Sequence, residues 1–153
     1  MKKFRLFLVC ILFSQVGFAQ DSANETAIKK LVEGETLAFA NADLEGWSNC
    51  FVHAPYLQWA VSATNDPTHV MSFDGWDALY NGAKAFLASK SGHADADALH
   101  KITRTGWDIH INGDMAWVKY IQVTDGDPVA AHEFRVLEKK DGKWLISMLC
   151  SLH

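Results

Sequence analysis

The sequence predicts an α+β fold in which a curved, mostly antiparallel sheet folds against a layer of about three N-terminal helices. Apolar residues recur at helical spacing in the first half of the chain, and β-rich segments fill the second half. The most specific signal is Asp141-Gly142 between two β-rich runs, because both central positions of a type I′ hairpin turn require positive φ. No repeat or second domain is indicated.

The first nineteen residues have the layout of a bacterial-type secretory signal peptide. Basic residues precede the apolar run 6–13, and the small residues Gly17 and Ala19 occupy the −3 and −1 positions before Gln20. The run is too short for a transmembrane helix, which needs about 20 apolar residues. A lipoprotein anchored at Cys10 is the alternative. We therefore expect an exported protein, periplasmic or secreted, that keeps no membrane attachment after cleavage.

Residues 20–153 are predicted to form a single domain. Three of the 14 basic residues and none of the 18 acidic ones precede residue 20, which leaves a formal charge of −7. Such a charge makes nucleic acid an unsuitable partner. Because 49% of the whole chain is apolar, the domain has material for a core without the help of a metal.

Three helices are predicted from the spacing of apolar residues. A capping box at Ser22 begins the first, Asp43 and Asp74 are the expected N-caps of the other two, and Pro55 ends the second. The predicted ranges are about 23–41, 43–53 and 74–89.

Short β-rich runs bounded by turn residues predict six strands. Asn112-Gly113 and Asp141-Gly142 are expected as tight turns, and residues 125–128 as a looser connection. The predicted ranges are 56–62, 69–73, 102–111, 115–124, 131–139 and 144–151.

Three segments in this order resemble the nuclear transport factor 2-like (NTF2-like) superfamily, and within it the SnoaL-like group that includes ketosteroid isomerase. They are Asp43-Leu-Glu-Gly-Trp, Gly113-Asp-Met-Ala-Trp-Val and Val136-Leu-Glu-Lys-Lys-Asp-Gly-Lys-Trp-Leu-Ile. The resemblance implies a cone-shaped, cystatin-like roll, in which a strongly curved sheet and the helices enclose an apolar pocket. It also implies a homodimer that forms through the outer face of the sheet. It marks the fold and assigns no reaction.

The same resemblance implies positions for pocket residues. Trp59 stands where ketosteroid isomerase-like proteins have the aspartate that abstracts a proton, and Glu35 stands where they have a tyrosine. His132 stands at the position of their protonated aspartic acid. A steroid isomerase mechanism therefore does not carry over.

Glu35 and His132 are also candidates on their own sequence context. Glu35 lies on the apolar stripe of the first helix, where a carboxylate must be paired, protonated or facing a cavity, unless it tilts into water. His132 alternates with the apolar residues Phe134 and Val136, which predicts that its imidazole faces inward. Together they would form a general acid–base pair, or His132 would be a hydrogen-bonded core residue without chemistry.

Aromatic side chains are the expected lining of a pocket. We predict that Trp59 faces inward from the first strand. The predicted lining is Trp59, Trp76, Tyr80 and Phe134.

Cys50 and Cys150 remain after processing and have two possible states, a disulfide permitted by export or two buried thiols. No histidine spacing matches a common zinc motif, and the cluster from His93 to His100 is more typical of a solvated acidic loop than of a cation site. No metal site, phosphate-binding loop or dinucleotide fingerprint is predicted, and hence no cofactor.

Three functions stay open from the sequence. The first is a binding module for a small apolar or ring-shaped molecule. The second is a proton-transfer enzyme, an isomerase, dehydratase or hydrolase, that uses Glu35 and His132. The third is a dimeric interaction module without a ligand. Whether the protein is an enzyme is left open.

Overall fold

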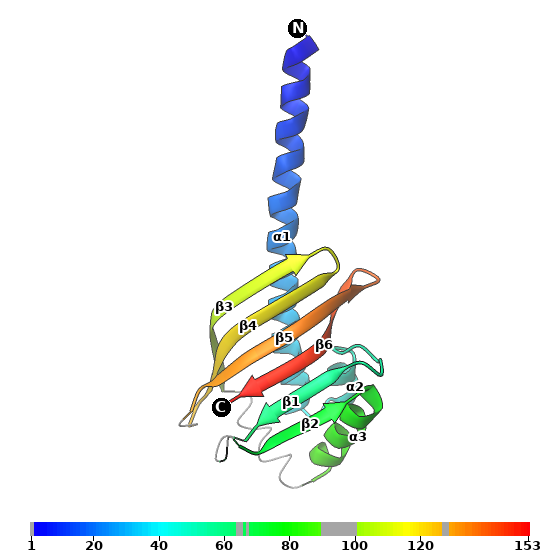
Figure 1. Cartoon of the computed structure of the whole chain (residues 1–153), viewed down its shortest axis with the longest axis vertical. Coiled ribbons are helices and arrows are strands. Elements are labelled where there is room, and N and C mark those ends of the chain that lie inside the picture. Colours follow the sequence, from blue (N-terminus) through cyan, green and yellow to red (C-terminus); the bar gives the residue numbers. More distant parts are fainter. Residues whose placement is uncertain (1, 64–65, 67, 90–100, 127–128) are drawn as a thin grey trace.

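A computed structural model describes residues 2–63, 66, 68–89, 101–126 and 129–153, with side chains from residue 21 onward. In this part of the chain, three helices and six strands confirm the predicted α+β fold (Figure 1). Their bounds are α1 Lys2–Ala40, α2 Leu44–Ser48, β1 Gln58–Ser62, β2 Val70–Asp74, α3 Trp76–Leu87, β3 Ile102–Asn112, β4 Met115–Thr124, β5 Ala131–Lys140 and β6 Lys143–Leu152.

The six strands form one curved, open sheet in the order β2-β1-β6-β5-β4-β3. All neighbours are antiparallel except β1 and β6, which run parallel. Helix α1 crosses one side of the sheet, which we call the inner face, and in Figure 1 it passes behind the strands. The opposite side, toward the viewer, is the outer face.

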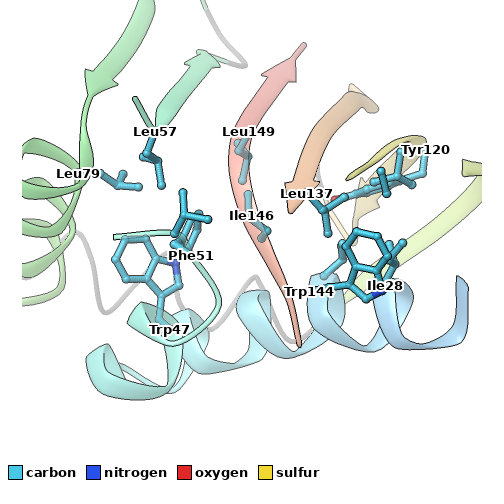
Figure 2. Packing of buried hydrophobic residues seen from close by; sticks show 14 of the residues in the cluster. Ile28, Trp47, Phe51, Leu57, Leu79, Tyr120, Leu137, Trp144, Ile146 and Leu149 are labelled. Atoms are coloured by element: carbon cyan, nitrogen blue, oxygen red, sulfur yellow. The ribbon is translucent and has the colours of Figure 1, made fainter. Parts of the chain in front are cut away.

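The apolar core fills the space between α1, α2 and the inner face (Figure 2). Ile28 and Val32 of α1 are fully buried in the same cluster as Leu137 and Ile146 of the sheet. Because Ile28 and Val32 are four residues apart, they lie on one side of the helix. This spacing produced the predicted stripe, and it is confirmed.

Asn24 marks the point where α1 begins to contact the sheet. Its Oδ1 accepts hydrogen bonds from Lys139 Nζ at 2.9 Å and from Trp144 Nε1 at 3.3 Å. Asn24 is 9% exposed, so the helix docks on the terminal hairpin from this residue onward.

Helix α1 is longer than predicted. It ends at Ala40, close to the expected residue, but it begins at Lys2 and runs without a break through residues 2–19. Its first half extends past β3 and the edge of the sheet in Figure 1. Among the residues searched, no helix combines the length and the apolar character that a membrane span requires.

The terminal hairpin has the predicted turn. Asp141 and Gly142 have φ of 51° and 78°, as a type I′ turn requires. The other tight turn is shifted by one residue from the prediction, because Asn112 pairs with Met115 and the loop is therefore Gly113-Asp114.

Strand β5 faces the opposite way from the prediction. The side chains buried on the inner face are Glu133, Arg135 and Leu137, with exposed fractions of 3%, 3% and 0%. His132 is exposed on the outer face. Our inference that the apolar residues Phe134 and Val136 mark the inner side was wrong, because this end of the inner face holds charged groups that pair with one another.

The outer face carries a row of exposed apolar side chains. Trp117 of β4 packs near Phe134 of β5, with ring centroids 6.2 Å apart. The exposed large residues on β4 and β6 are Met115, Trp117, Ile121, Val123 and Leu152. Several exposed apolar side chains on one face are typical of a surface that another molecule covers.

Helix α3 contains a glycine for a steric reason. Asp74, the predicted N-cap, belongs to β2, and Gly75 with φ of 83° precedes the helix instead. Inside the helix, a Cβ added at Gly82 would lie 2.4 Å from Cζ of Phe73. The absence of a side chain at Gly82 lets the Phe73 ring lie directly on the helix.

Two glycine-to-alanine variants test this contact. Alanine is favoured over glycine in a helix by up to about 1 kcal/mol, so Gly34→Ala in α1 should stabilise the protein, because no atom lies within 4 Å of the added Cβ. Gly82→Ala should instead be less stable than Gly34→Ala by about 1–3 kcal/mol, the usual cost of overpacking. Urea unfolding measures both; equal stabilisation of the two variants would contradict the role of Gly82.

Candidate functional site

A cavity of about 500 Å³ lies between the helices and the inner face. Its volume is in the range of sites that hold small molecules. Most of its wall is apolar and comes from α1, α2, β1, β2, α3 and β6. The main apolar contributors are Phe39, Trp47, Trp59, Phe73, Phe86 and Leu149.

One part of the wall is ionic. Arg135 Nη1 donates to Glu35 Oε2 at 3.0 Å, and Arg135 Nη2 lies 3.5 Å from Glu133 Oε2. All three side chains are almost fully buried and line the cavity. We call Glu35, Arg135 and Glu133 the ion cluster. It joins helix α1 to strand β5 across the cavity wall.

Neutral groups complete the ion cluster. Trp47 Nε1 donates to Glu35 Oε1 at 3.0 Å, and Ser151 Oγ donates to Glu133 Oε1 at 2.7 Å. Each carboxylate therefore accepts hydrogen bonds on both oxygens. Buried carboxylates need such partners, because an unpaired buried charge is costly.

The charge of Arg135 is firmly held. Burial alone would lower the pKa of its guanidinium, but Tyr120, Glu35 and Glu133 outweigh burial and raise that pKa above its ordinary value. Burial also raises the pKa of the Tyr120 phenol to about 12, against the opposing effect of Arg135. Arg135 is thus a cation and Tyr120 a neutral phenol at physiological pH.

The segment after α1 explains how Trp47 reaches Glu35. Asp43 caps α2 by accepting a hydrogen bond from the Gly46 backbone N–H at 2.8 Å. A Cβ at Gly46 would lie only 2.2 Å from that carboxylate, so the cap requires glycine. The following residue, Trp47, then lies under α1 with its indole N–H toward Glu35. The segment Asp43-Leu-Glu-Gly-Trp therefore builds part of the cavity wall.

The structure brings together two of the predicted site residues. Glu35 and Trp59 line the cavity, as predicted. Trp76 and Tyr80 were also predicted to line the cavity, and this was wrong, because they are not among its lining residues. They lie in an adjoining aromatic cluster, with ring centroids 5.3 Å apart. Trp76 also lines a separate hollow with His53, on which it stacks. Phe134 lies on the outer face, so its prediction as pocket lining was wrong.

Glu35 and His132 do not form a pair. Glu35 is buried on the inner face, whereas His132 is exposed on the outer face of β5. The partners of Glu35 are Arg135 and Trp47. The acid–base pair predicted from the sequence is therefore wrong, because His132 lies on the opposite face of the sheet from Glu35.

Cys50 and Cys150 are free thiols. Cys50 donates to the Gly46 carbonyl on the helical side, and Cys150 pairs with Phe134, which places it on the outer face. The sheet separates them, so the disulfide alternative is not realised. Burial and the nearby Glu35 raise the pKa of the Cys50 thiol to about 11, which keeps it protonated and unreactive.

Sequence reasoning missed Glu133, Arg135, Ser151 and His153. His153 lines the cavity, and its Nδ1 lies 3.0 Å from the Ser62 carbonyl oxygen. The acidic loop from His93 to His100 lies outside the described residues. Within the described part, no three His, Cys, Asp or Glu side chains are placed to hold a metal ion.

No family model matches the sequence, and no curated protein matches it either. Solved structures do. An NTF2-like protein of unknown function from Shewanella oneidensis is 19% identical with a TM-score of 0.59, and the match covers 84% of this chain and 98% of that one. The chain has the NTF2-like fold.

Two other structures agree with this NTF2-like fold. A Pseudomonas putida NTF2-like protein of unknown function has a TM-score of 0.61 at 13% identity, with 86% of this chain and 87% of that one covered. A Burkholderia xenovorans cystatin-like fold protein has a TM-score of 0.62 at 12% identity, with 82% and 88% covered. The resemblance noted in the sequence is therefore confirmed at the level of the fold.

Replacing Arg135 tests the ion cluster. Arg135→Met leaves two buried carboxylates without their cation and should lower the free energy of unfolding by about 3–5 kcal/mol. The control is Lys140→Met, which removes an exposed lysine 3.3 Å from Glu138 and should change that free energy by at most about 1 kcal/mol. Urea unfolding measures both, and similar small losses would show that the ion cluster does not hold the fold together.

Proposed function

We propose that the protein binds a small, largely apolar, ring-shaped molecule in the cavity. The observation that carries this proposal is a space of about 500 Å³ with aromatic walls beside a fixed ion cluster. An apolar body gains by leaving water for such walls, at about 25 cal/mol per Å² buried. The ion cluster, held in place by its own ion pairs, would orient the ligand without needing to rearrange.

Trp59 is the residue best suited to test binding, because it lines the cavity from β1 and packs on Phe73, with ring centroids 5.5 Å apart. Naphthalene serves as an apolar two-ring probe in isothermal titration calorimetry. Trp59→Ala should weaken its binding about tenfold, which corresponds to the 1.4 kcal/mol typical of a lost aromatic contact.

The matched control is Trp117→Ala, which removes an exposed tryptophan of the outer face. It should leave naphthalene affinity unchanged. Equal weakening by both variants, or no binding of naphthalene to the unmodified protein, would refute the proposal. Mass spectrometry of any molecule that co-purifies with the protein gives the natural ligand directly.

A proton-transfer enzyme is a second candidate, and one observation favours it. Two carboxylates, Glu35 and Glu133, line an apolar cavity and are linked by one guanidinium. Paired carboxylates can divide the roles of general acid and general base. In that case Glu35→Gln and Glu133→Gln would abolish turnover of the co-purifying molecule while its affinity remains, whereas a binding protein turns over none.

We also propose that the protein is exported by cleavage before Gln20 and forms a homodimer through the outer face. The basic and apolar layout of residues 1–19 supports export. The exposed row that includes Trp117, Ile121 and Val123 supports self-association. Native mass spectrometry of protein from its host should give a subunit that begins at Gln20 and twice that mass for the assembly. A monomer would refute the proposed homodimer, and a subunit that retains residue 1 would refute the proposed cleavage.

A further inference from the structure

His153 has a defined hydrogen-bonding state in the cavity wall. Its Nδ1 lies 3.0 Å from the Ser62 carbonyl oxygen, and its backbone N–H donates to Ser62 Oγ at 2.8 Å. A carbonyl oxygen can only accept, so Nδ1 must carry the hydrogen. In the tautomer that carries only this hydrogen, the other nitrogen, Nε2, is an acceptor.

Further acceptors lie at the same end of the sheet. Glu133 pairs with Ser151, two residues before His153, and Gln122 pairs with Ala131. A carboxylate has about four lone-pair sites, and Glu133 uses one for Ser151 and one for Arg135, so capacity remains. The Oε1 of Gln122 has no hydrogen-bond partner among the described residues.

Most donors of the ion cluster and its partners are engaged, and only Arg135 Nε among them has no hydrogen-bond partner in the described part of the chain. Trp47 Nε1 donates to Glu35, Ser151 Oγ donates to Glu133, and both Nη atoms of Arg135 face the two carboxylates. Among the described residues that line the cavity, two carboxylates, Glu35 and Glu133, therefore flank a single guanidinium, that of Arg135. A ligand carboxylate would meet like charge there, whereas an O–H or N–H donor would meet free acceptors.

We infer that the ligand is a neutral ring compound with a hydroxyl or amino donor, which His153 Nε2 and Glu133 accept. This inference rests on the proposed binding function and makes it more specific. Trp59 and its apolar neighbours would contact the ring, and His153 would select the polar substituent. His153 is thus a specificity-determining residue of the cavity.

Three probes of similar size test the inference in isothermal titration calorimetry: naphthalene, naphthol and naphthoate. Naphthol should bind about tenfold more tightly than naphthalene, as one added hydrogen bond to an acceptor allows. Naphthoate should bind more weakly than naphthalene. If naphthol shows no advantage, or naphthoate binds most tightly, the inference is wrong even though naphthalene binding still supports the proposed function.

Variants of His153 assign the effect to this residue. His153→Phe keeps an aromatic ring but removes Nε2, so naphthol and naphthalene should bind with equal affinity. The ratio of the two affinities is the readout, because the new ring also changes the apolar contacts of both probes. His153→Gln restores an acceptor and should recover part of the preference; it also serves if His153→Phe does not fold. The control His132→Phe changes the exposed histidine of the outer face and should keep the full preference. A preference that survives both His153 variants would overturn the inference.

Discussion

The interaction on which the rest of the structure depends is the ion cluster of Glu35, Arg135 and Glu133. Glu35 comes from α1, and the other two come from neighbouring inward positions of β5. Breaking such a buried arrangement on one side costs far more than the intact arrangement gains, because the remaining charges keep no partner. The cluster therefore fixes the rotation of α1 about its axis and the register of β5 at the same time.

This constraint also separates the core from the cavity. One helical face carries Ile28 and Val32 into the closed apolar core, and one turn later it presents Glu35. Charged side chains with satisfied hydrogen bonds do not collapse onto apolar neighbours, since each would lose its partners. Beyond them Phe39 and the aromatic residues of α2 and α3 form a wall that faces a space of about 500 Å³. The core closes at one end of α1, and the cavity lies at the other.

The fold was largely predictable because its signals are local. The Asp141-Gly142 turn, the Asp43 cap and the stripe of Ile28 and Val32 each depend on residues close in sequence. The inward face of β5 was not predictable from local signals, because Glu133 and Arg135 alternate with Phe134 and Val136. Either pair can face inward. Ordinary alternation favours the apolar pair. The orientation of β5 is decided by a residue far away in the sequence. Glu35, predicted to be buried, needs a cation, and Arg135 supplies it from one hundred positions away.

The reversal of β5 links the cavity to the outer face. Because side chains alternate along a strand, the register that places Glu133 and Arg135 in the cavity also places His132, Phe134 and Val136 outside. Phe134 then joins Trp117 on an exposed apolar surface. A slip of one residue would bury the apolar pair and leave Glu35 without its cation. The same slip would remove the outer apolar surface. The ligand site and the surface proposed for self-association are thus two consequences of one choice of register, and a variant that weakens Arg135 should disturb both.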